Sequence, residues 1–161
     1  MLDLDSVTDR AGSATVQILK PVGLNAKLPK LVADVAVSTA EQSKQLVKQF
    51  NLLLVAHGSK GDRASFQATT WLVESIEKTC DFASVHAAFL EETPFLDDQL
   101  RRIEGPLLVV GLFIGDGLHA GVDLPEAIQR SGRNDILLVP PLAQSLEFIE
   151  MICSQLNQDE V

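Results

Sequence analysis

The chain has 161 residues, of which 46% are hydrophobic and 22% charged, a composition typical of one soluble globular domain with a substantial core. The formal net charge of −9 and the lack of a basic stripe in the sequence argue against a nucleic-acid partner. Residues 1–50 carry six Lys/Arg and five Asp/Glu, whereas residues 51–161 carry seven and seventeen. We therefore divide the chain into an N-terminal extension over 1–50 and an acidic unit over 51–161.

The N-terminal sequence predicts neither export nor membrane insertion. Acidic residues stand at positions 3 and 5, where a secretory signal would carry basic ones, and no apolar stretch approaches the ~20 residues that span a bilayer. We therefore expect a cytoplasmic protein that has no membrane partner. Cys80 and Cys153 lie far apart without a C-x-x-C pair, so we expect two buried thiols rather than a disulfide framework or a zinc knuckle.

The extension is predicted to be partly helical. Ser38 followed by Glu41 matches a capping box, which predicts a helix over about 39–49 that leads into the next strand. A shorter helix can also form after Pro29, with an apolar side made of Leu31, Val32, Val35 and Ala36. Residues 14–19 can form an added strand.

From residue 51 onward, short apolar runs alternate with stretches of helical period. The predicted strands are residues 51–56, 83–90, 107–114 and 136–140, and helices are predicted over about 62–80, 93–103, from 123, and over 143–156. We expect Thr93 to cap the second of these helices with Pro94 at its first position, and Asp123 with Glu126 to form a capping box at the third. Four successive strand–helix units predict an α/β fold of three layers, in which helices cover both faces of a four-stranded parallel sheet.

Three side chains are predicted to meet at the carboxyl edge of this sheet. In an open α/β sheet, ligands bind where the strand order reverses, and in the flavodoxin-like order 2-1-3-4 the first and third strands are neighbours. His57 and His119 lie in the loops that leave these two strands, and Glu91 follows the second strand. Two imidazoles and a carboxylate can bind zinc, cobalt, nickel or iron. His57 could instead bond only to nearby backbone, and Glu91 or Glu92 could be a solvated charge at a helix entry.

The loops that carry these residues are rich in glycine, and glycine lets a ligand approach the backbone closely. We assign Gly58, Ser59 and Gly117 as candidate binding positions, because amides that precede a helix can hold a carboxylate or phosphate. His86 lies in the middle of a predicted strand, where we expect a partly buried, hydrogen-bonded side chain. Neither a nucleophile elbow, nor a dinucleotide fingerprint, nor a Walker A motif matches the sequence.

Three sequence blocks together resemble the CbiX-type sirohydrochlorin chelatases. They are Leu53 to Ser59 (LLVAHGS), Phe89-Leu90-Glu91 with Pro94, and Gly117-Leu118-His119 with Asp123-Leu124-Pro125. The resemblance covers about residues 51–150 and implies a chelatase-like fold. It also implies insertion of cobalt(II), or of iron(II) or nickel(II) in relatives, into sirohydrochlorin for cobalamin or siroheme biosynthesis, without an organic cofactor.

By the same resemblance, His57 and His119 would handle the metal ion and Glu91 would be their acidic partner. The family works as two units that face each other, which for a single unit implies a homodimer. Lys60 and Arg63 are local bases that could meet the carboxylates of such a substrate. Two alternatives remain at this stage: a non-catalytic module that binds a tetrapyrrole or metal, and a flavodoxin-like binder of a phosphate-bearing cofactor.

Overall fold

The computed structural model describes residues 19–113 and 119–158, and it contains the predicted parallel sheet. The strands are β1 (Asn51–Ala56), β2 (Ser84–Phe89), β3 (Leu107–Gly111) and β4 (Ile136–Leu138). All pairings are parallel, and the strand order is β2-β1-β3-β4, as expected. Strand β1 therefore lies at the centre, between the second and third strands in the sequence.

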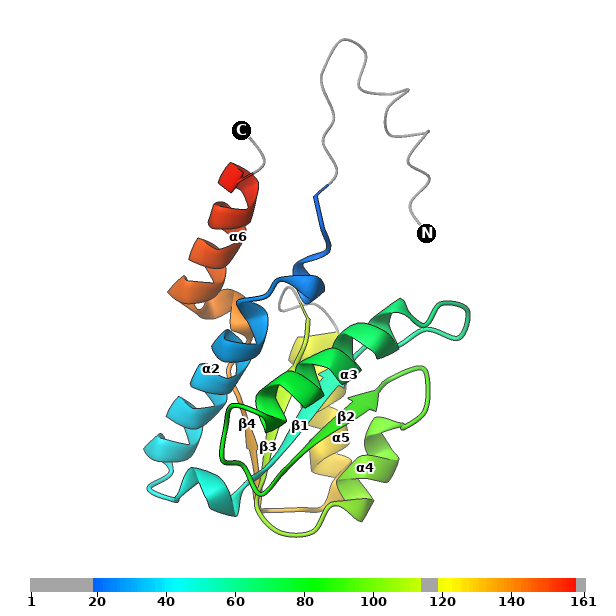
Figure 1. The fold of residues 1–161 in the computed structure, drawn as a ribbon. Coiled ribbons are helices and arrows are strands. Elements are labelled where there is room, and N and C mark those ends of the chain that lie inside the picture. The colour runs from blue at the N-terminus through cyan, green and yellow to red at the C-terminus, as the bar shows by residue number, and fades with distance from the viewer. Residues whose placement is uncertain (1–18, 114–118, 159–161) are drawn as a thin grey trace.

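Helices cover both faces of the sheet, which gives three layers (Figure 1). Helices α2 (Leu28–Gln42), α3 (Ala64–Glu77) and α6 (Leu146–Gln158) lie on one face, and α4 (Leu96–Arg102) and α5 (Leu124–Ser131) lie on the other. Short 3-10 turns occur at Val22–Leu24, Val47–Gln49 and Leu142–Gln144, and a π-helical turn at His119–Asp123 precedes α5. No helix in the described parts of the chain is both long and apolar enough to cross a membrane.

The uninterrupted apolar sequence of β1 is explained by burial on both faces. Leu52 and Leu54 pack into the core beneath α2, α3 and α6, whereas Leu53 and Val55 pack into the core beneath α4 and α5. All four are completely buried. Alternate side chains of a strand point to opposite faces, so both faces of a strand inside a three-layer fold favour apolar side chains, and in β1 only the first residue, Asn51, is polar.

The helix predicted over about 39–49 is wrong in position. Helix α2 begins at Leu28 and ends at Gln42, and the chain then turns through Lys44, whose φ is +61°. Ser38 lies inside α2, so it does not form a capping box with Glu41. The shorter helix expected after Pro29 does form and is longer than predicted, and its apolar side is buried against the sheet: Leu28, Leu31, Val32, Ala33, Ala36 and Ala40. Tertiary burial outweighs a local capping pattern here.

Helix α2 belongs to the same hydrophobic core as the strands, so part of the N-terminal extension is built into the domain. The added strand predicted over 14–19 falls almost entirely outside the described residues. Cys80 is half-buried and Cys153 is exposed, and both are free thiols; the expectation that both are buried is therefore wrong for Cys153.

Two predicted helix starts differ from the structure. The Thr93–Pro94 peptide is cis, and α4 begins only at Leu96 after Phe95 has bridged to Phe89, so Thr93 is not its cap. Asp123 has helical dihedral angles and makes no capping hydrogen bond, because the π-helical turn already precedes it. The predicted inward residues of α4, Leu96, Leu100 and Ile103, are buried as expected.

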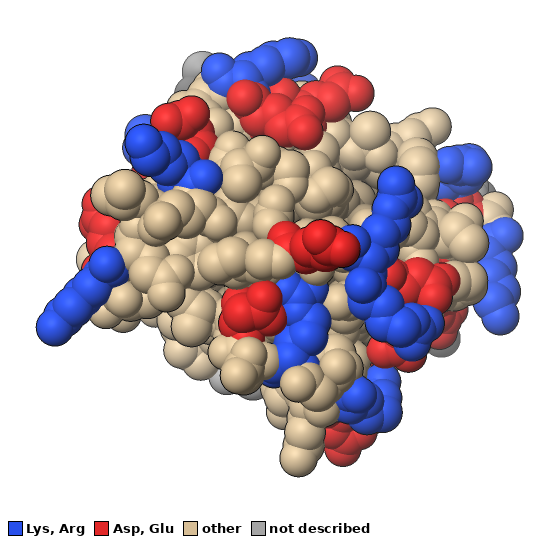
Figure 2. Space-filling model, turned by 90° about the horizontal axis from the view of Figure 1, so that it is seen from below, with Lys and Arg blue, Asp and Glu red and all other residues tan. Residues whose placement is uncertain are grey.

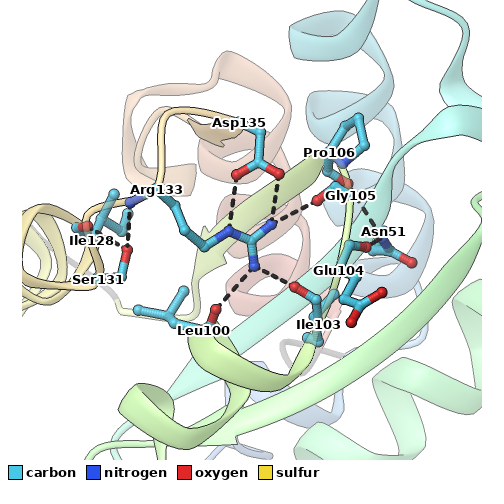
Figure 3. Close-up of polar contacts among 10 residues, drawn as sticks. All are labelled: Asn51, Leu100, Ile103, Glu104, Gly105, Pro106, Ile128, Ser131, Arg133 and Asp135. Atoms are coloured by element: carbon cyan, nitrogen blue, oxygen red, sulfur yellow. Dashed lines mark hydrogen bonds and ion pairs between the residues drawn. The ribbon is translucent and has the colours of Figure 1, made fainter.

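An arginine clamp fixes the C-terminal end of α4 to the start of β4 (Figure 3). The Arg133 guanidinium donates hydrogen bonds to the carbonyl oxygens of Leu100 at 2.9 Å, Gly105 at 2.6 Å and Ile103. It also donates to both carboxylate oxygens of Asp135, at 2.9 and 3.0 Å, and these hydrogen bonds lower the pKa of Asp135. The carbonyls at a helix C-terminus lack intrahelical partners, and Arg133 supplies them.

The lower face of the molecule carries both signs of charge. Figure 2 shows Lys and Arg side chains interspersed with Asp and Glu there, separated by uncharged surface. Among the described residues on this face, neither sign gathers into an extended patch.

Candidate functional site

The loops that follow β1 and β2 lie side by side at one end of the sheet, on the right in Figure 1. The strand register pairs Ala56 with Phe89, so the two chains leave the sheet together. The backbone N–H groups of Leu90 and Glu91 then donate to the carbonyl oxygen of His57, at 3.1 and 3.0 Å. These bonds extend the pairing beyond the strands and hold His57 and Glu91 at the same edge.

His57 and Glu91 are brought together, as the sequence predicted. His57 Nε2 lies 3.8 Å from Glu91 Oε1, and the two side chains are 42% and 54% exposed. Two ligands of one tetrahedral ion lie about 3.4 Å apart, because each bond is about 2.0–2.2 Å long. A small closing movement of either exposed side chain therefore allows both atoms to bind one ion.

The backbone favours one tautomer of the neutral His57 ring. Its Nδ1 lies 3.0 Å from the carbonyl oxygen of Gly58, and a carbonyl oxygen only accepts, so Nδ1 carries the proton. In the neutral ring Nε2 then bears the lone pair, on the side of Glu91. A backbone carbonyl that fixes the outer nitrogen of a histidine is a common support for metal-binding imidazoles.

Gly58 allows the loop to turn tightly beneath this pair. Its φ is +79°, and a Cβ there would lie 2.9 Å from Glu92 Cγ and 3.0 Å from Phe89 Cβ. Glu92 closes this turn by accepting a hydrogen bond from the N–H of Ser59 at 3.1 Å, and Ser59 Oγ accepts from Gly61 and Asp62. The Ser59 amide thus donates to the chain's own carboxylate in this structure, and a ligand carboxylate that binds there would have to displace Glu92.

A cavity of about 520 Å³ opens beside the His57–Glu91 pair, between α4 and α5. Its acidic side chains are Glu91, Asp97, Asp98 and Asp123. Arg101 and Arg130 also line it: Arg101 lies 2.6 Å from Asp98, and Arg130 bridges the two helices at 3.5 Å from Asp97. The cavity therefore presents carboxylates to a cation and guanidinium groups to an anion within one space.

The third predicted metal ligand, His119, cannot be placed as a side chain. Its backbone begins the π-helical turn before α5, but its side chain lies outside the described set, and so does all of Gly117. Strand β3 does lie next to β1, which is the pairing that the predicted convergence of His57 and His119 requires. Among the side chains that the structure describes, no group of three or more His, Cys, Asp or Glu could hold a metal ion.

Other sequence expectations near the site have clear outcomes. His86 is partly buried and its Nε2 lies 2.7 Å from Ser84 Oγ, as expected for a structural histidine. Burial, and to a lesser degree the charge of Arg102, lower the pKa of His86. Arg63 stacks on the ring of Phe66, 4.1 Å from its centroid, so one of the two predicted local bases lies against its own helix.

Sequence reasoning missed the roles of Glu92 and of the residues that line the cavity. Glu91 was preferred over Glu92 as the oriented carboxylate, because Glu91 continues the side-chain alternation of the preceding strand; the bond of Glu92 to the Ser59 amide was not predicted. Besides residues from the ends of β1 and β2, the cavity is lined by residues of α4 and α5, which are separated by β3 in the sequence. Asp97 lies in the first turn of α4 and Arg130 in the last turn of α5, and both helices cover the same face of the sheet. These positions are the sequence signal that could have predicted the contact between the two residues.

Comparisons with known proteins identify the family and the fold. The model of one protein family, CbiX, matches residues 51–159. A probable sirohydrochlorin cobaltochelatase of Halobacterium salinarum is 29% identical over 127 residues, which are 77% of this chain and 43% of that protein. The chain thus spans less than half the length of this curated relative.

Two solved structures share the fold. One is CbiX, described as the terminal enzyme for biosynthesis of siroheme in denitrifying bacteria. It matches with a TM-score of 0.88 and 26% identity over 99% of this chain and 70% of its own. SirB from Bacillus subtilis with Fe³⁺ matches with a TM-score of 0.77 and 13% identity over 97% of this chain and 62% of its own, a likeness of fold alone.

Proposed function

Since the chain belongs to the CbiX family, we propose that it inserts a divalent metal ion into sirohydrochlorin. The observation that carries this proposal is the pair formed by His57 Nε2 and Glu91 Oε1, 3.8 Å apart at the carboxyl edge of the sheet. Both atoms are electron-pair donors when the imidazole is neutral. Such a pair attracts either a proton or a metal cation, and a chelatase must handle both.

The chemistry assigns separate tasks to the two side chains. Metal insertion exchanges two pyrrole N–H protons of the macrocycle for one divalent ion. A His57 ring whose Nδ1–H is bonded to the Gly58 carbonyl can bind the arriving ion through Nε2 and, once the ion has passed to the macrocycle, accept one displaced proton there; the second proton passes to solvent at this exposed edge. The Glu91 carboxylate stabilises either product, the bound cation or the imidazolium. Because both side chains are half exposed, the ion is held weakly enough to be passed on.

We propose cobalt(II) as the metal, with His119 as a second imidazole ligand. The cobalt assignment is supported by the Halobacterium relative, which is described as a probable cobaltochelatase. The His119 assignment is supported by the β1–β3 pairing and by the resemblance of its sequence block. Iron(II) and nickel(II) prefer the same nitrogen and oxygen ligands, so the metal must be identified by competition.

The cavity between α4 and α5 supports an anionic substrate as well as a cation. Arg101 and Arg130 each have an exposed guanidinium held by a carboxylate, and sirohydrochlorin carries many carboxylates that could exchange for these partners. We further propose that two such units act together. This chain spans 43% of the curated relative and 70% of the CbiX structure, so part of each lies beyond what one copy matches.

The test is sirohydrochlorin metallation by the full chain, followed by the absorbance change of the macrocycle with Co²⁺, Ni²⁺ or Fe²⁺. We expect His57→Ala and Glu91→Gln to lower the rate at least tenfold. His86→Ala and Glu74→Gln are the matched controls and retain the wild-type rate, because both residues lie outside the cavity and its rim. Equal rates for His57→Ala and His86→Ala would contradict the proposal. Stoichiometric binding of tetrapyrrole without turnover would instead select a non-catalytic carrier.

A further inference from the structure

Glu91 and Glu92 are neighbours in the sequence, but their carboxylates have different partners. Glu91 Oε1 lies 3.8 Å from His57 Nε2, whereas Glu92 Oε1 accepts a hydrogen bond from the backbone N–H of Ser59 at 3.1 Å. Ser59 follows His57 by two residues, so the Cα atoms of these two residues lie within about 7 Å of each other. A backbone donor that already holds a carboxylate therefore lies beside the proposed metal-binding pair.

The N–H of Ser59 takes its acceptor from outside its own loop. Nearby donors are bonded within the loop: Ser59 Oγ accepts from the N–H groups of Gly61 and Asp62, both at 3.3 Å. Asp62 Oδ1 accepts from the N–H of Ala64 at 2.9 Å. The Ser59 N–H instead donates to Glu92, 33 positions later in the chain. An N–H group without an acceptor is costly, but any carboxylate oxygen at this place can fill the role of Glu92.

The Glu92 carboxylate is held loosely enough to be exchanged. Within residues 19–113 and 119–158, no Lys, Arg or His side chain forms an ion pair with it, so a single N–H group is its partner. A bidentate pair with an arginine would hold a carboxylate more firmly. Gly58 keeps the approach open, because a Cβ there would lie 2.9 Å from Glu92 Cγ, in the space that Glu92 vacates when it leaves.

Two cations of the same loop are available to an incoming carboxylate. Lys60 and Arg63 are both exposed, and in the part of the chain that the structure describes neither forms an ion pair. Arg63 lies over the ring of Phe66, 4.1 Å from its centroid, which holds the guanidinium near the end of the loop. A ligand carboxylate at the Ser59 N–H is therefore attracted by charges that Glu92 does not pair.

We propose that Glu92 occupies the place of a substrate carboxylate, and that one carboxylate on the rim of the macrocycle displaces it from the Ser59 N–H when the substrate binds. This inference rests on the proposed function, and it names the backbone donor that holds the substrate and the residue that competes for it. The exchange replaces one hydrogen bond by another of the same kind, and the released Glu92 carboxylate turns to solvent. A macrocycle without a carboxylate at this position cannot replace the lost bond, so Glu92 selects for carboxylated substrates.

The first experiment measures binding of metal-free sirohydrochlorin to the full chain, by absorbance titration without any metal ion. We expect Glu92→Ala to bind it about fivefold more tightly than the wild type, because the competing hydrogen bond is gone. A residue that only braced the loop would weaken binding when removed. Affinity of Glu92→Ala equal to or below that of the wild type therefore overturns the proposal.

The matched control separates occupation of the amide from charge. Glu92→Gln loses the negative charge but keeps an oxygen that can accept from the Ser59 N–H, so its affinity should stay within about twofold of the wild type. The titrations are made in about 0.5 M NaCl, where charges more than about 4–5 Å apart are largely screened. Equal gains in Glu92→Ala and Glu92→Gln would show that charge alone matters, and would overturn the exchange.

The second experiment removes the carboxylates from the ligand. With the methyl ester of sirohydrochlorin, the affinity ratio between Glu92→Ala and the wild type should fall from about five to about one, because an ester cannot take the place of Glu92. A ratio that persists with the ester overturns the proposal. If the wild type inserts metal into sirohydrochlorin but Glu92→Ala gains no affinity, only the exchange is refuted. If neither protein binds sirohydrochlorin, the proposed function itself is refuted and the exchange with it.

Discussion

Gly58 and Gly105 offer a matched pair of substitutions that separates backbone strain from crowding at the site. Their φ angles are +79° and +80°, so alanine meets the same left-handed conformation at both positions. At Gly105 a new Cβ has no neighbour within 4 Å, whereas at Gly58 it would lie 2.9 Å from Glu92 Cγ and 3.0 Å from Phe89 Cβ. Phe89 is completely buried and cannot retreat, so Glu92 must move.

The magnitudes follow from these distances. A left-handed alanine costs roughly 1–2 kcal/mol at either position, and crowding in a packed site adds about 1–3 kcal/mol at Gly58 alone. Alanine also restricts the unfolded chain equally in both variants, so this contribution cancels in the difference. We therefore expect Gly58→Ala to lower the free energy of unfolding by about 1–3 kcal/mol more than Gly105→Ala does.

Urea unfolding of both variants measures this difference, and metallation assays measure its consequence. Moving Glu92 breaks its bond with the Ser59 amide and displaces the loop that holds His57, so Gly58→Ala should also lose activity while Gly105→Ala retains it. A difference in unfolding free energy below about 0.5 kcal/mol would refute the steric part of this reasoning.

The remaining predictions concern three side chains. In Arg133→Lys the charge is kept, but an ammonium group cannot bond three carbonyls and a carboxylate together, so the free energy of unfolding in urea should fall by about 1–3 kcal/mol. The control is Arg101→Lys, which alters an exposed ion pair and should change that free energy by less than about 0.5 kcal/mol. Burial lowers the pKa of His86, so as the pH falls below 6.5 the unfolded chain takes up a proton on this histidine before the folded chain does, and the free energy of unfolding decreases. In His86→Gln this free energy should decrease less between about pH 7.5 and 5.5. An unchanged pH dependence would contradict this prediction. Glu92→Ala leaves the Ser59 amide without its acceptor, so the free energy of unfolding should decrease by about 1 kcal/mol and the Tm should fall. A Tm equal to that of the wild type would argue against this hydrogen bond.

The candidate site shows how far a sequence reading can reach. The proximity of His57 and Glu91 could be predicted because the apolar runs show where each strand ends, and the carboxyl ends of parallel strands lie at one edge of the sheet. Glu92 was not predicted, because only the turn at Gly58 directs its carboxylate to the Ser59 amide. The helix over 39–49 failed for a related reason. A capping pattern is a local signal worth about 1 kcal/mol, whereas the apolar side of α2 buries six residues in the core.

The sequence by itself determined the strand–helix alternation, the parallel sheet and the loops that carry the candidate site, because these follow from hydrophobic period and chain order. Only the tertiary structure decided which residues distant in the sequence contact one another. It placed Arg130 beside Asp97 over the cavity, and Arg133 across the end of α4. It also decided which side of α6 remains exposed, since the helix is apolar on more than one side and only packing against α2 selects the side to be buried. Such contacts depend on how the layers stack, a property that no local pattern of residues encodes.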